Sequence, residues 1–239
     1  MKNGETKWEQ EVCLLEERPC RIFRRGQGPV LFWGVQEDRA ESCTALAEEL
    51  ASAQAGPFTL VAFEAKDWNA EFSPWEAPPV FGSEGFAGGA RTTLDWLEQA
   101  CQSGSLQTEH AQNRYLGGYS LSGLFSLWAL YESDLFSGAA CCSGSLWFPG
   151  WGDYAQQRKL RSDSFLYLSL GKKEERARNR IMASVGEQTR KQAALAVGQL
   201  GEKHCSLRWE EGGHFAEPMQ RMQRGFLWLL SAKKQEQGI

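Results

Sequence analysis

The sequence contains no C-x-x-C pair and no export signal, although it has seven cysteines. Zinc sites and disulfide frameworks need paired spacings or, in secreted chains, an even set. The dispersed, odd set predicts neither a disulfide framework nor a metal site. We expect the adjacent pair Cys141 and Cys142, which lies in an apolar run, to be buried, because free cysteine is among the most buried residue types.

Long apolar runs and dense basic blocks are missing as well. No stretch approaches the roughly 18 apolar residues of a membrane span, and the first eleven residues lack the apolar core of a signal peptide. Lys and Arg are spread along a chain of net charge −4, which gives no electrostatic footprint for nucleic acid or an anionic membrane. We expect a cytoplasmic protein that acts on a small molecule, with neither nucleic acid nor membrane as a partner.

Internal repeats and low-complexity linkers are also absent, and no change of composition marks a boundary. The chain has 239 residues, of which 42% are hydrophobic, and this is enough for one large α/β core. We therefore expect residues 1–239 to form a single domain.

What the sequence does have is an alternation of short apolar runs with helical patterns. A β-rich stretch at 11–25, followed by a Gly/Pro break at 26–29, is predicted as a hairpin that leads to a buried strand. The alternation predicts a mostly parallel twisted sheet with helices on both faces and ligands beyond the carboxyl ends of its strands. Buried strands are expected at 30–33, 58–63, 113–119, 138–143, 165–170 and 205–209, and helices at 39–53, 87–101, 121–131, 183–200 and 218–230.

One serine stands at a predicted strand-to-helix turn, in the run from Gly118 to Gly123 (GYSLSG). A nucleophile at such a turn needs small residues two positions before and after it, because strand and helix approach closely there. Gly118 meets the first need, whereas Ser122 stands where glycine is usual. The turn would aim the Ser120 hydroxyl out of the sheet and the Leu121 N–H toward an oxyanion. Alternatively, Ser120 simply caps the helix.

One histidine fits the same end of the sheet. Of the three histidines, His110 and His204 lie in polar stretches before predicted strands, at the opposite end from Ser120. His214 follows the predicted strand 205–209 and two glycines, which allow a tight loop over the sheet edge. We interpret His214 as the base that takes the Ser120 proton.

Carboxylates that could orient this base follow two strand ends. Hydrolases with a nucleophile at such a turn carry their triad in the order serine, acid, histidine. Glu174, four residues past the strand 165–170, is our preferred acid. Glu175 and Glu211 remain open as alternatives.

With these residues in view, the sequence resembles the esterase branch of the α/β-hydrolases, which includes the enterobactin and salmochelin esterases and esterase D. The likeness covers most of the chain after Pro29. It implies an α/β-hydrolase fold without a large cap domain and cofactor-free acyl transfer, with Ser120 as nucleophile and His214 as base. The motifs are 67–69 (DWN), 72–75 (FSPW), 81–85 (FGSEG), the serine turn, 143–147 (SGSLW) and 211–215 (EGGHF).

The second donor of the oxyanion hole departs from the common pattern. Many hydrolases have His-Gly after the third strand, where a backbone N–H completes the hole. Here the strand ends in the run from Phe32 to Gln36 (FWGVQ), which retains Gly34. The sequence leaves open whether Val35 or Gln36 supplies the N–H.

These features favour a serine hydrolase that cleaves an ester through an acyl-enzyme. The alternative is a non-catalytic protein of the same fold that binds a ligand or partner. Four aromatic residues are expected to shape the substrate pocket, with burial in the core as the alternative for each: Trp68, Trp75, Phe81 and Trp147.

The segment 66–85 is too long and too aromatic for a mere connector. It begins at the carboxyl end of a predicted strand, so we expect it to fold over Ser120 as a wall. Its only cation is Lys66, from which we expect an acidic rim that favours neutral or cationic esters. The acidic residues are Asp67, Glu71, Glu76 and Glu84.

Overall fold

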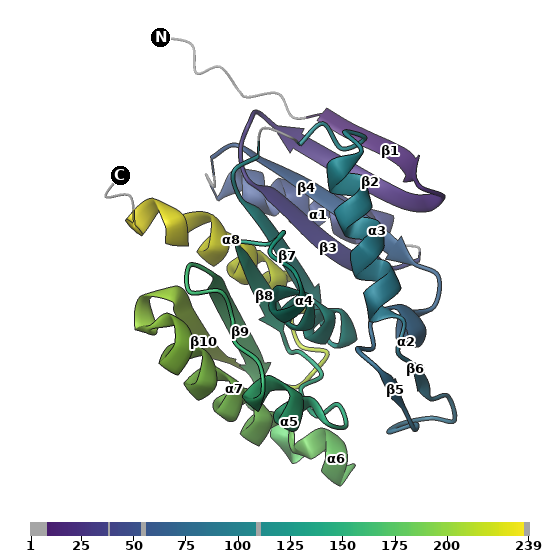
Figure 1. The fold of residues 1–239 in the computed structure, drawn as a ribbon, viewed down its shortest axis with the longest axis vertical. Helices are drawn as coiled ribbons and strands as arrows, with labels where there is room; N and C mark the ends of the chain where they lie inside the picture. The colour runs from purple at the N-terminus through teal and green to yellow at the C-terminus, as the bar shows by residue number, and fades with distance from the viewer. Residues whose placement is uncertain (1–8, 38, 54–55, 109–110, 237–239) are drawn as a thin grey trace.

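The computed structural model describes residues 9–37, 39–53, 56–108 and 111–236, and its central element is an eight-stranded sheet (Figure 1). The strand order is β1-β2-β4-β3-β7-β8-β9-β10; β1 and β2 run antiparallel to their neighbours, and the strands from β4 to β10 pair in parallel. This is the mostly parallel sheet that the sequence predicts. The strands are β1 Glu9–Leu15, β2 Arg18–Arg25, β3 Val30–Gln36, β4 Phe58–Ala65, β7 Arg114–Tyr119, β8 Gly138–Cys142, β9 Phe165–Gly171 and β10 Cys205–Glu210.

The hairpin at the N-terminal edge turns inside the stretch predicted as β. Glu16 and Glu17 form the turn between β1 and β2 with φ of 48° and 64°, the left-handed values that a two-residue hairpin turn requires. Asn and Gly usually mark such turns, so a Glu pair gives no sequence signal. The Gly/Pro break at 26–29 instead links β2 to β3.

Helices cover both faces of the sheet, as predicted (Figure 1). One face packs against α1 (Ala40–Ser52) and α8 (Pro218–Glu236). The other packs against α3 (Ala90–Gln102), α4 (Leu121–Glu132), α5 (Trp151–Gln156) and α7 (Val185–Leu200). Smaller elements are α2 Trp68–Glu71, β5 Glu76–Ala77, β6 Phe86–Ala87, η1 Glu174–Arg176, α6 Arg180–Ala183 and η2 Glu202–His204.

The helix that follows the candidate nucleophile is the most deeply enclosed. Residues from Leu121 to Leu130 of α4 are all buried, and the helix packs against β7 and β8. A helix that is apolar on all sides belongs inside a protein, which agrees with its LFSLWAL run. The deep position of α4 fixes the start of the helix, and with it the backbone around Ser120, against the middle of the sheet.

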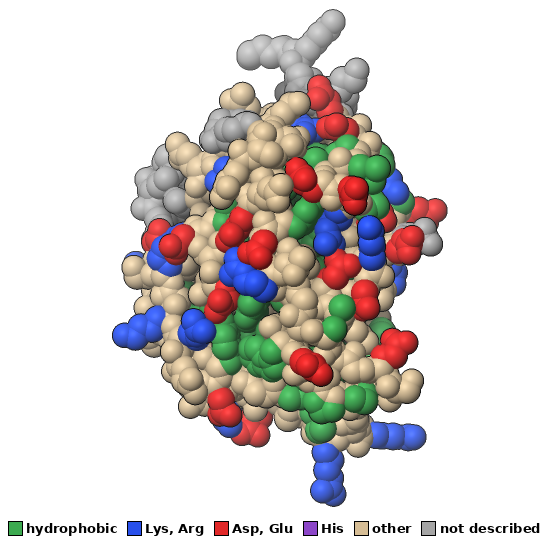
Figure 2. All heavy atoms as spheres, turned by 45° about the vertical axis from the view of Figure 1, so that its right-hand side comes forward, with side chains coloured by type: hydrophobic (Ala, Val, Ile, Leu, Met, Phe, Trp, Pro, Cys, Tyr) green, Lys and Arg blue, Asp and Glu red, His purple; other side chains and the backbone are tan. Residues whose placement is uncertain are grey.

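No segment of the described residues forms a separate cap over this sheet. Cys141 and Cys142 are buried, as expected, and both are free thiols. On the face in Figure 2, basic and acidic side chains are interspersed. Across the described ranges, no helix combines the length and apolarity needed to cross a bilayer, and no three His, Cys, Asp or Glu side chains are grouped to hold a metal ion.

Candidate active site

Ser120 lies between β7 and α4 in a strained backbone conformation. Its φ of 61° and ψ of −123° are values that non-glycine residues rarely adopt. A Cβ on Gly118 would lie 2.1 Å from the carbonyl oxygen of Ser122 and 2.3 Å from its hydroxyl, so only glycine fits at that position. The close approach of strand and helix that the sequence predicts is therefore present.

Ser122, which replaces the usual glycine of the turn, makes a defined contact. Its buried hydroxyl donates to the carbonyl oxygen of Gly34 at the end of β3, with an Oγ–O distance of 2.8 Å. The side chain thus fits within the turn and ties the start of α4 to the strand end expected to complete the oxyanion hole.

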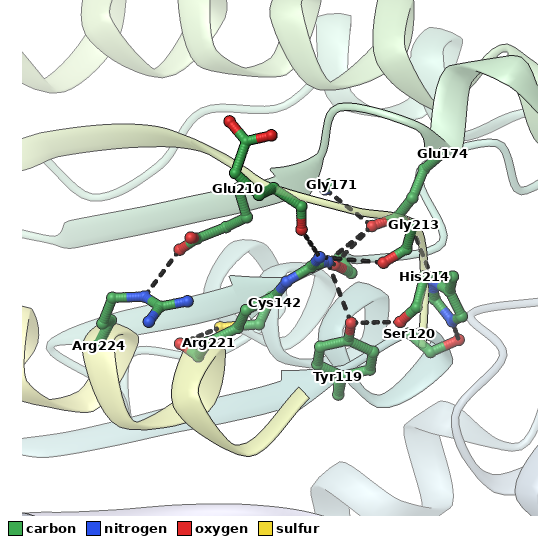
Figure 3. A network of polar contacts seen from close by, with 12 residues as sticks. Tyr119, Ser120, Cys142, Gly171, Glu174, Glu210, Gly213, His214, Arg221 and Arg224 are labelled. Atoms are coloured by element: carbon green, nitrogen blue, oxygen red, sulfur yellow. Dashed lines mark hydrogen bonds and ion pairs between the residues drawn. The ribbon is translucent and has the colours of Figure 1, made fainter. Parts of the chain in front are cut away.

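Three side chains from separate elements form a continuous line of hydrogen bonds (Figure 3). His214, in the loop after β10, has its Nε2 atom 3.1 Å from Ser120 Oγ. Its Nδ1 atom lies 2.7 Å from Oε2 of Glu174, in η1 after β9. With the Nδ1 proton directed at the carboxylate, Nε2 accepts the Ser120 hydroxyl.

Glu174 is the carboxylate that contacts His214, and the two alternatives do not. Glu175 pairs with Arg190 at 2.9 Å, and the exposed Glu211 pairs with Lys172. The side chain of Glu174 is only 5% exposed, whereas that of Glu211 is 83% exposed. The three-residue helix η1 directs Glu174 toward Gly171 and His214, whereas the side chain of Glu175 points toward Arg190.

The environment of Glu174 favours its ionised form. Burial alone would raise the pKa of this carboxyl, but the hydrogen bond and charge of His214, the N–H of Gly171 and the hydroxyl of Ser143 hold it below the ordinary value. Oε1 lies 2.8 Å from both the Gly171 nitrogen and Ser143 Oγ. The carboxylate is therefore charged and fixed in place at neutral pH.

This lowered pKa predicts how stability depends on pH. A carboxyl whose pKa is lower in the folded than in the unfolded chain contributes stability above the unfolded value and loses it as pH falls through the folded value. Below about pH 4.3, we expect the unfolding free energy of the wild type to fall more steeply than that of Glu174→Gln. Urea denaturation from pH 6 to pH 3 measures this, and parallel curves for the two proteins would contradict it.

Two residues that the sequence analysis missed surround this line. The part-buried phenol of Tyr119 donates to the carbonyl oxygen of His214 at 2.5 Å, and desolvation raises its pKa to about 12, so it remains a donor. Arg221 of α8 is fully buried and contacts Glu174 at 2.9 Å. A signal for Arg221 was available, because it is four residues before Gly225 and eight before Leu229, on the buried stripe of the helix.

Two cavities meet at Ser120. The smaller has a volume of about 380 Å³ and the larger about 970 Å³. Both contain Gln36, Trp68, Ser120, His214 and Phe215 in their walls. The smaller cavity is otherwise lined by Trp33, Gly34, Val35, Arg39, Ser42, Tyr119, Pro218, Met219 and Met222, and the larger by Lys66, Asp67, Asn69, Phe81, Glu84, Trp147, Lys173, Glu174, Ala177, Met182 and Val185.

The residues expected to supply oxyanion donors lie around the nucleophile. Leu121 is the first residue of α4 and directly follows Ser120. Val35 and Gln36 end β3 and line the smaller cavity, and Gln36 also lines the larger one.

The structure brings three of the four predicted pocket aromatics to the cavities. Trp68 lines both, and Phe81 and Trp147 line the larger one. Trp75 lines neither of these two cavities. Its indole N–H donates to the carbonyl oxygen of Pro149 at 2.9 Å, and its ring packs against core aromatics, Phe148 and Tyr154. Sequence order could not separate Trp75 from Trp68, because both lie in the same loop.

The contrast between these two tryptophans gives a matched pair of variants. Trp68→Ala should raise KM for a good ester substrate, by about tenfold, because it removes a large apolar wall of both cavities. Trp75→Ala should leave KM unchanged and lower the melting temperature, because it removes a packed ring and a hydrogen bond. Steady-state kinetics and thermal unfolding of both variants check this; an increased KM in Trp75→Ala alone would contradict it.

Phe215 was also missed by the sequence analysis. It follows His214, lines both cavities and is 92% exposed, so its ring stands at the junction of the two spaces. Its position within the motif 211–215 was the sequence signal that could have identified it as a site residue.

The acidic rim expected from segment 66–85 does not form. Glu71 pairs with Arg18, and Glu76 lines a separate hollow beside β5 and β6. Asp67 and Glu84 line the larger cavity together with two cationic residues, Lys66 and Lys173. The acidic side chains of the segment are therefore divided among three places. This arrangement does not support the expected preference for neutral or cationic esters.

His204 precedes β10 and His214 follows it, so the two histidines lie at opposite ends of that strand. In η2, His204 stacks on Phe165 with a ring distance of 4.6 Å, and its Nδ1 atom is 3.1 Å from the carbonyl oxygen of Ser164. His110 lies outside the described residues.

Comparison with known proteins gives a likeness in structure but not in sequence. No model of a protein family matches the chain. No curated protein matches it in sequence either.

Solved structures with the same fold are numerous. The siderophore hydrolase EstB from Aspergillus nidulans has 16% sequence identity and a TM-score of 0.71, over 93% of this chain and 94% of that one. An IroE-like serine hydrolase from Shewanella oneidensis has 17% identity and a TM-score of 0.74, over 94% and 80% of the two chains. A ferulic acid esterase has 11% identity and a TM-score of 0.61, over 95% and 98%. At these identities the likeness shows a shared fold.

Proposed function

Starting from this α/β-hydrolase fold, we propose that the protein is a serine esterase that cleaves an ester through an acyl-enzyme. One observation carries the proposal: the unbroken line from Ser120 Oγ through the His214 ring to Glu174, with donor–acceptor distances of 3.1 and 2.7 Å. That the solved structures of this fold include proteins described as siderophore hydrolases and a ferulic acid esterase supports the same reading.

The proposed reaction has two halves. Ser120 Oγ attacks the ester carbonyl carbon while Nε2 of His214 takes its proton, and the proton then passes to the departing alcohol oxygen. Water repeats the steps on the acyl-enzyme and releases the acid. Glu174 keeps the Nδ1 proton in place and stabilises the imidazolium that forms in each half.

Of the two candidates for the second oxyanion donor, the geometry favours Gln36. Along a strand, the N–H and C=O of one residue point to one side and those of the next residue to the other. The carbonyl of Gly34 points toward Ser122 at the start of α4. By alternation the N–H of Val35 points toward β4, and that of Gln36 points back toward Ser120.

The pairing of β3 leaves room for this role. Its register with β7 ends at Trp33, whereas its register with β4 continues to Gln36. The N–H of Gln36 therefore lies beyond the last β7 partner. Together with the N–H of Leu121, it would hold the oxyanion of each tetrahedral intermediate.

The two cavities suggest an ester with bulk on both sides of the scissile bond. Their apolar walls include flat rings, and the larger cavity is also lined by two cationic residues, Lys66 and Lys173, and by the carboxylates Asp67, Glu84 and Glu174. Aromatic or other rigid apolar groups fit such walls.

Labelling with a fluorophosphonate probe tests the proposal. An active serine hydrolase should bind the probe covalently, with the adduct mapped by peptide mass spectrometry to Ser120. A structure of the adduct should place the phosphonyl oxygen within about 3 Å of the N–H groups of Leu121 and Gln36. A folded protein that remains unlabelled would instead support a non-catalytic protein that binds a ligand in these cavities.

A further inference from the structure

Helix α8 carries an arginine that is completely enclosed beneath the site. Arg221 has no exposed side-chain surface. Burying a guanidinium costs several kcal/mol unless its charge and its N–H groups find partners. The groups that contact the guanidinium therefore indicate the role of Arg221.

Among the described residues, the hydrogen bonds of Nη1 and Nη2 of Arg221 go to residues of the candidate active site and to the loop that carries its histidine (Figure 3). Nη1 donates to Oε1 of Glu174 at 2.9 Å, to Ser143 Oγ at 2.7 Å and to the Tyr119 hydroxyl at 3.2 Å. Nη2 donates to the carbonyl oxygens of Glu211 and Gly213, both at 3.0 Å.

These contacts reach His214 by three routes. Through Glu174, the arginine occupies Oε1 and leaves Oε2 directed at Nδ1 of His214. Through the carbonyl of Gly213, it fixes the residue immediately before the histidine. Through the Tyr119 hydroxyl, which donates to the carbonyl of His214, it holds the histidine backbone itself.

We propose that Arg221 is a positioning residue of the esterase site, which holds the acid Glu174 and the loop of the base His214 in one fixed arrangement. The inference rests on the proposed function. It goes beyond a structural ion pair, because a side chain needed only to neutralise Glu174 would not also bind the loop carbonyls and Tyr119. Arg221 does not touch the reacting atoms and acts through the residues that do.

The geometry of the guanidinium explains why arginine stands here. Its planar fork supplies several N–H donors in fixed directions, whereas a lysine supplies one compact charge. Lysine at this position would retain the charge beside Glu174 but lose the contacts of one Nη atom. A displacement of a catalytic group by about 1 Å can cost on the order of 10²-fold in rate.

The test compares Arg221→Lys with Arg224→Met, a matched control one turn along α8. Arg224 pairs with Glu210 at 2.9 Å and has no contact with Glu174 or the histidine loop among the described residues. With a p-nitrophenyl ester, we expect Arg221→Lys to lower kcat by at least about tenfold while KM changes by less than about threefold. Arg224→Met should keep both constants near wild type.

A double-mutant cycle with Glu174→Gln separates positioning from general damage to the fold. If Arg221 acts largely through Glu174, adding Arg221→Lys to Glu174→Gln should cost much less in kcat than Arg221→Lys costs alone. A wild-type kcat in folded Arg221→Lys would overturn the proposal, and independent additive losses in the cycle would overturn the part of it that acts through Glu174. Covalent labelling of wild-type Ser120 is measured first, so failure of the esterase proposal is distinguished from failure of this one.

Smaller variants decide the matter if Arg221→Lys does not fold. Tyr119→Phe and Ser143→Ala each remove one partner of the guanidinium and leave the arginine in place. We expect each to lower kcat severalfold with an unchanged KM. Wild-type kcat in both variants would overturn the proposal.

Discussion

Replacing Ser120 with alanine should abolish ester hydrolysis and covalent labelling by a fluorophosphonate. Removal of a triad serine costs several orders of magnitude in kcat, on the order of 10⁴-fold or more, because no other group can form the acyl-enzyme. The fold should persist, because the backbone of residue 120 keeps its hydrogen bonds to Cys142 and Ser145. Stopped assays with a p-nitrophenyl ester and thermal unfolding measure the two effects.

The neighbouring hydroxyl provides the control. Ser145 Oγ lies 3.4 Å from Ser120 Oγ, within reach of a misdirected probe. Ser145→Ala should still be labelled at Ser120. Hydrolysis at the wild-type rate by Ser120→Ala would show that Ser120 is not the nucleophile.

In protein that remains folded, Glu174→Gln should lower kcat by about 10²-fold or more. Glutamine has nearly the same shape, but it carries no charge to stabilise the imidazolium and can present an N–H where Oε2 accepts from His214. The loss is smaller than that of Ser120→Ala, because the nucleophile and the oxyanion donors remain. Steady-state kinetics at pH 7 to 8 measure it.

The two carboxylates first considered beside Glu174 are matched controls. Glu175 and Glu211 are paired with Arg190 and Lys172 at the surface. Glu175→Gln and Glu211→Gln should therefore keep a kcat within about twofold of wild type. If either of them lost as much activity as Glu174→Gln, the acid would have to be reassigned.

The sheet and the position of the serine turn could be predicted from the sequence because each rests on a strong local signal. Short apolar runs separated by helical patterns have few alternatives to a parallel sheet covered by helices. A glycine two residues before a serine, between a strand and an apolar helix, is equally local. The carboxyl ends of parallel strands then bring distant segments to one edge, which places His214 and Glu174 near Ser120.

The packing around the site could not be predicted in the same way. The orientation of Trp75 depends on Pro149 and Phe148, which are more than 70 residues away. The three-residue turn η1 decides that Glu174 and not Glu175 faces inward, and neighbouring glutamates in a charged run look alike. Residue type alone does not separate Arg221, which is fully buried, from Arg224, which is partly exposed; helical spacing places Arg221 on the buried stripe but does not show which residues it contacts.

The late position of Arg221 in the chain bears on how the protein acquires activity. Ser120 and its strained turn are made by β7 and α4, in the middle of the sequence, whereas His214 follows β10 and Arg221 is part of α8. Helix α8 packs against β7, β8 and β9, so its packing surface is made by strands from the middle and the later part of the chain. A nascent or cleaved chain that ends before α8 would contain Ser120, but its His214 would lack the contacts with Arg221 that hold it in place. If the protein is the proposed esterase, its ester turnover would therefore depend on the docking of α8.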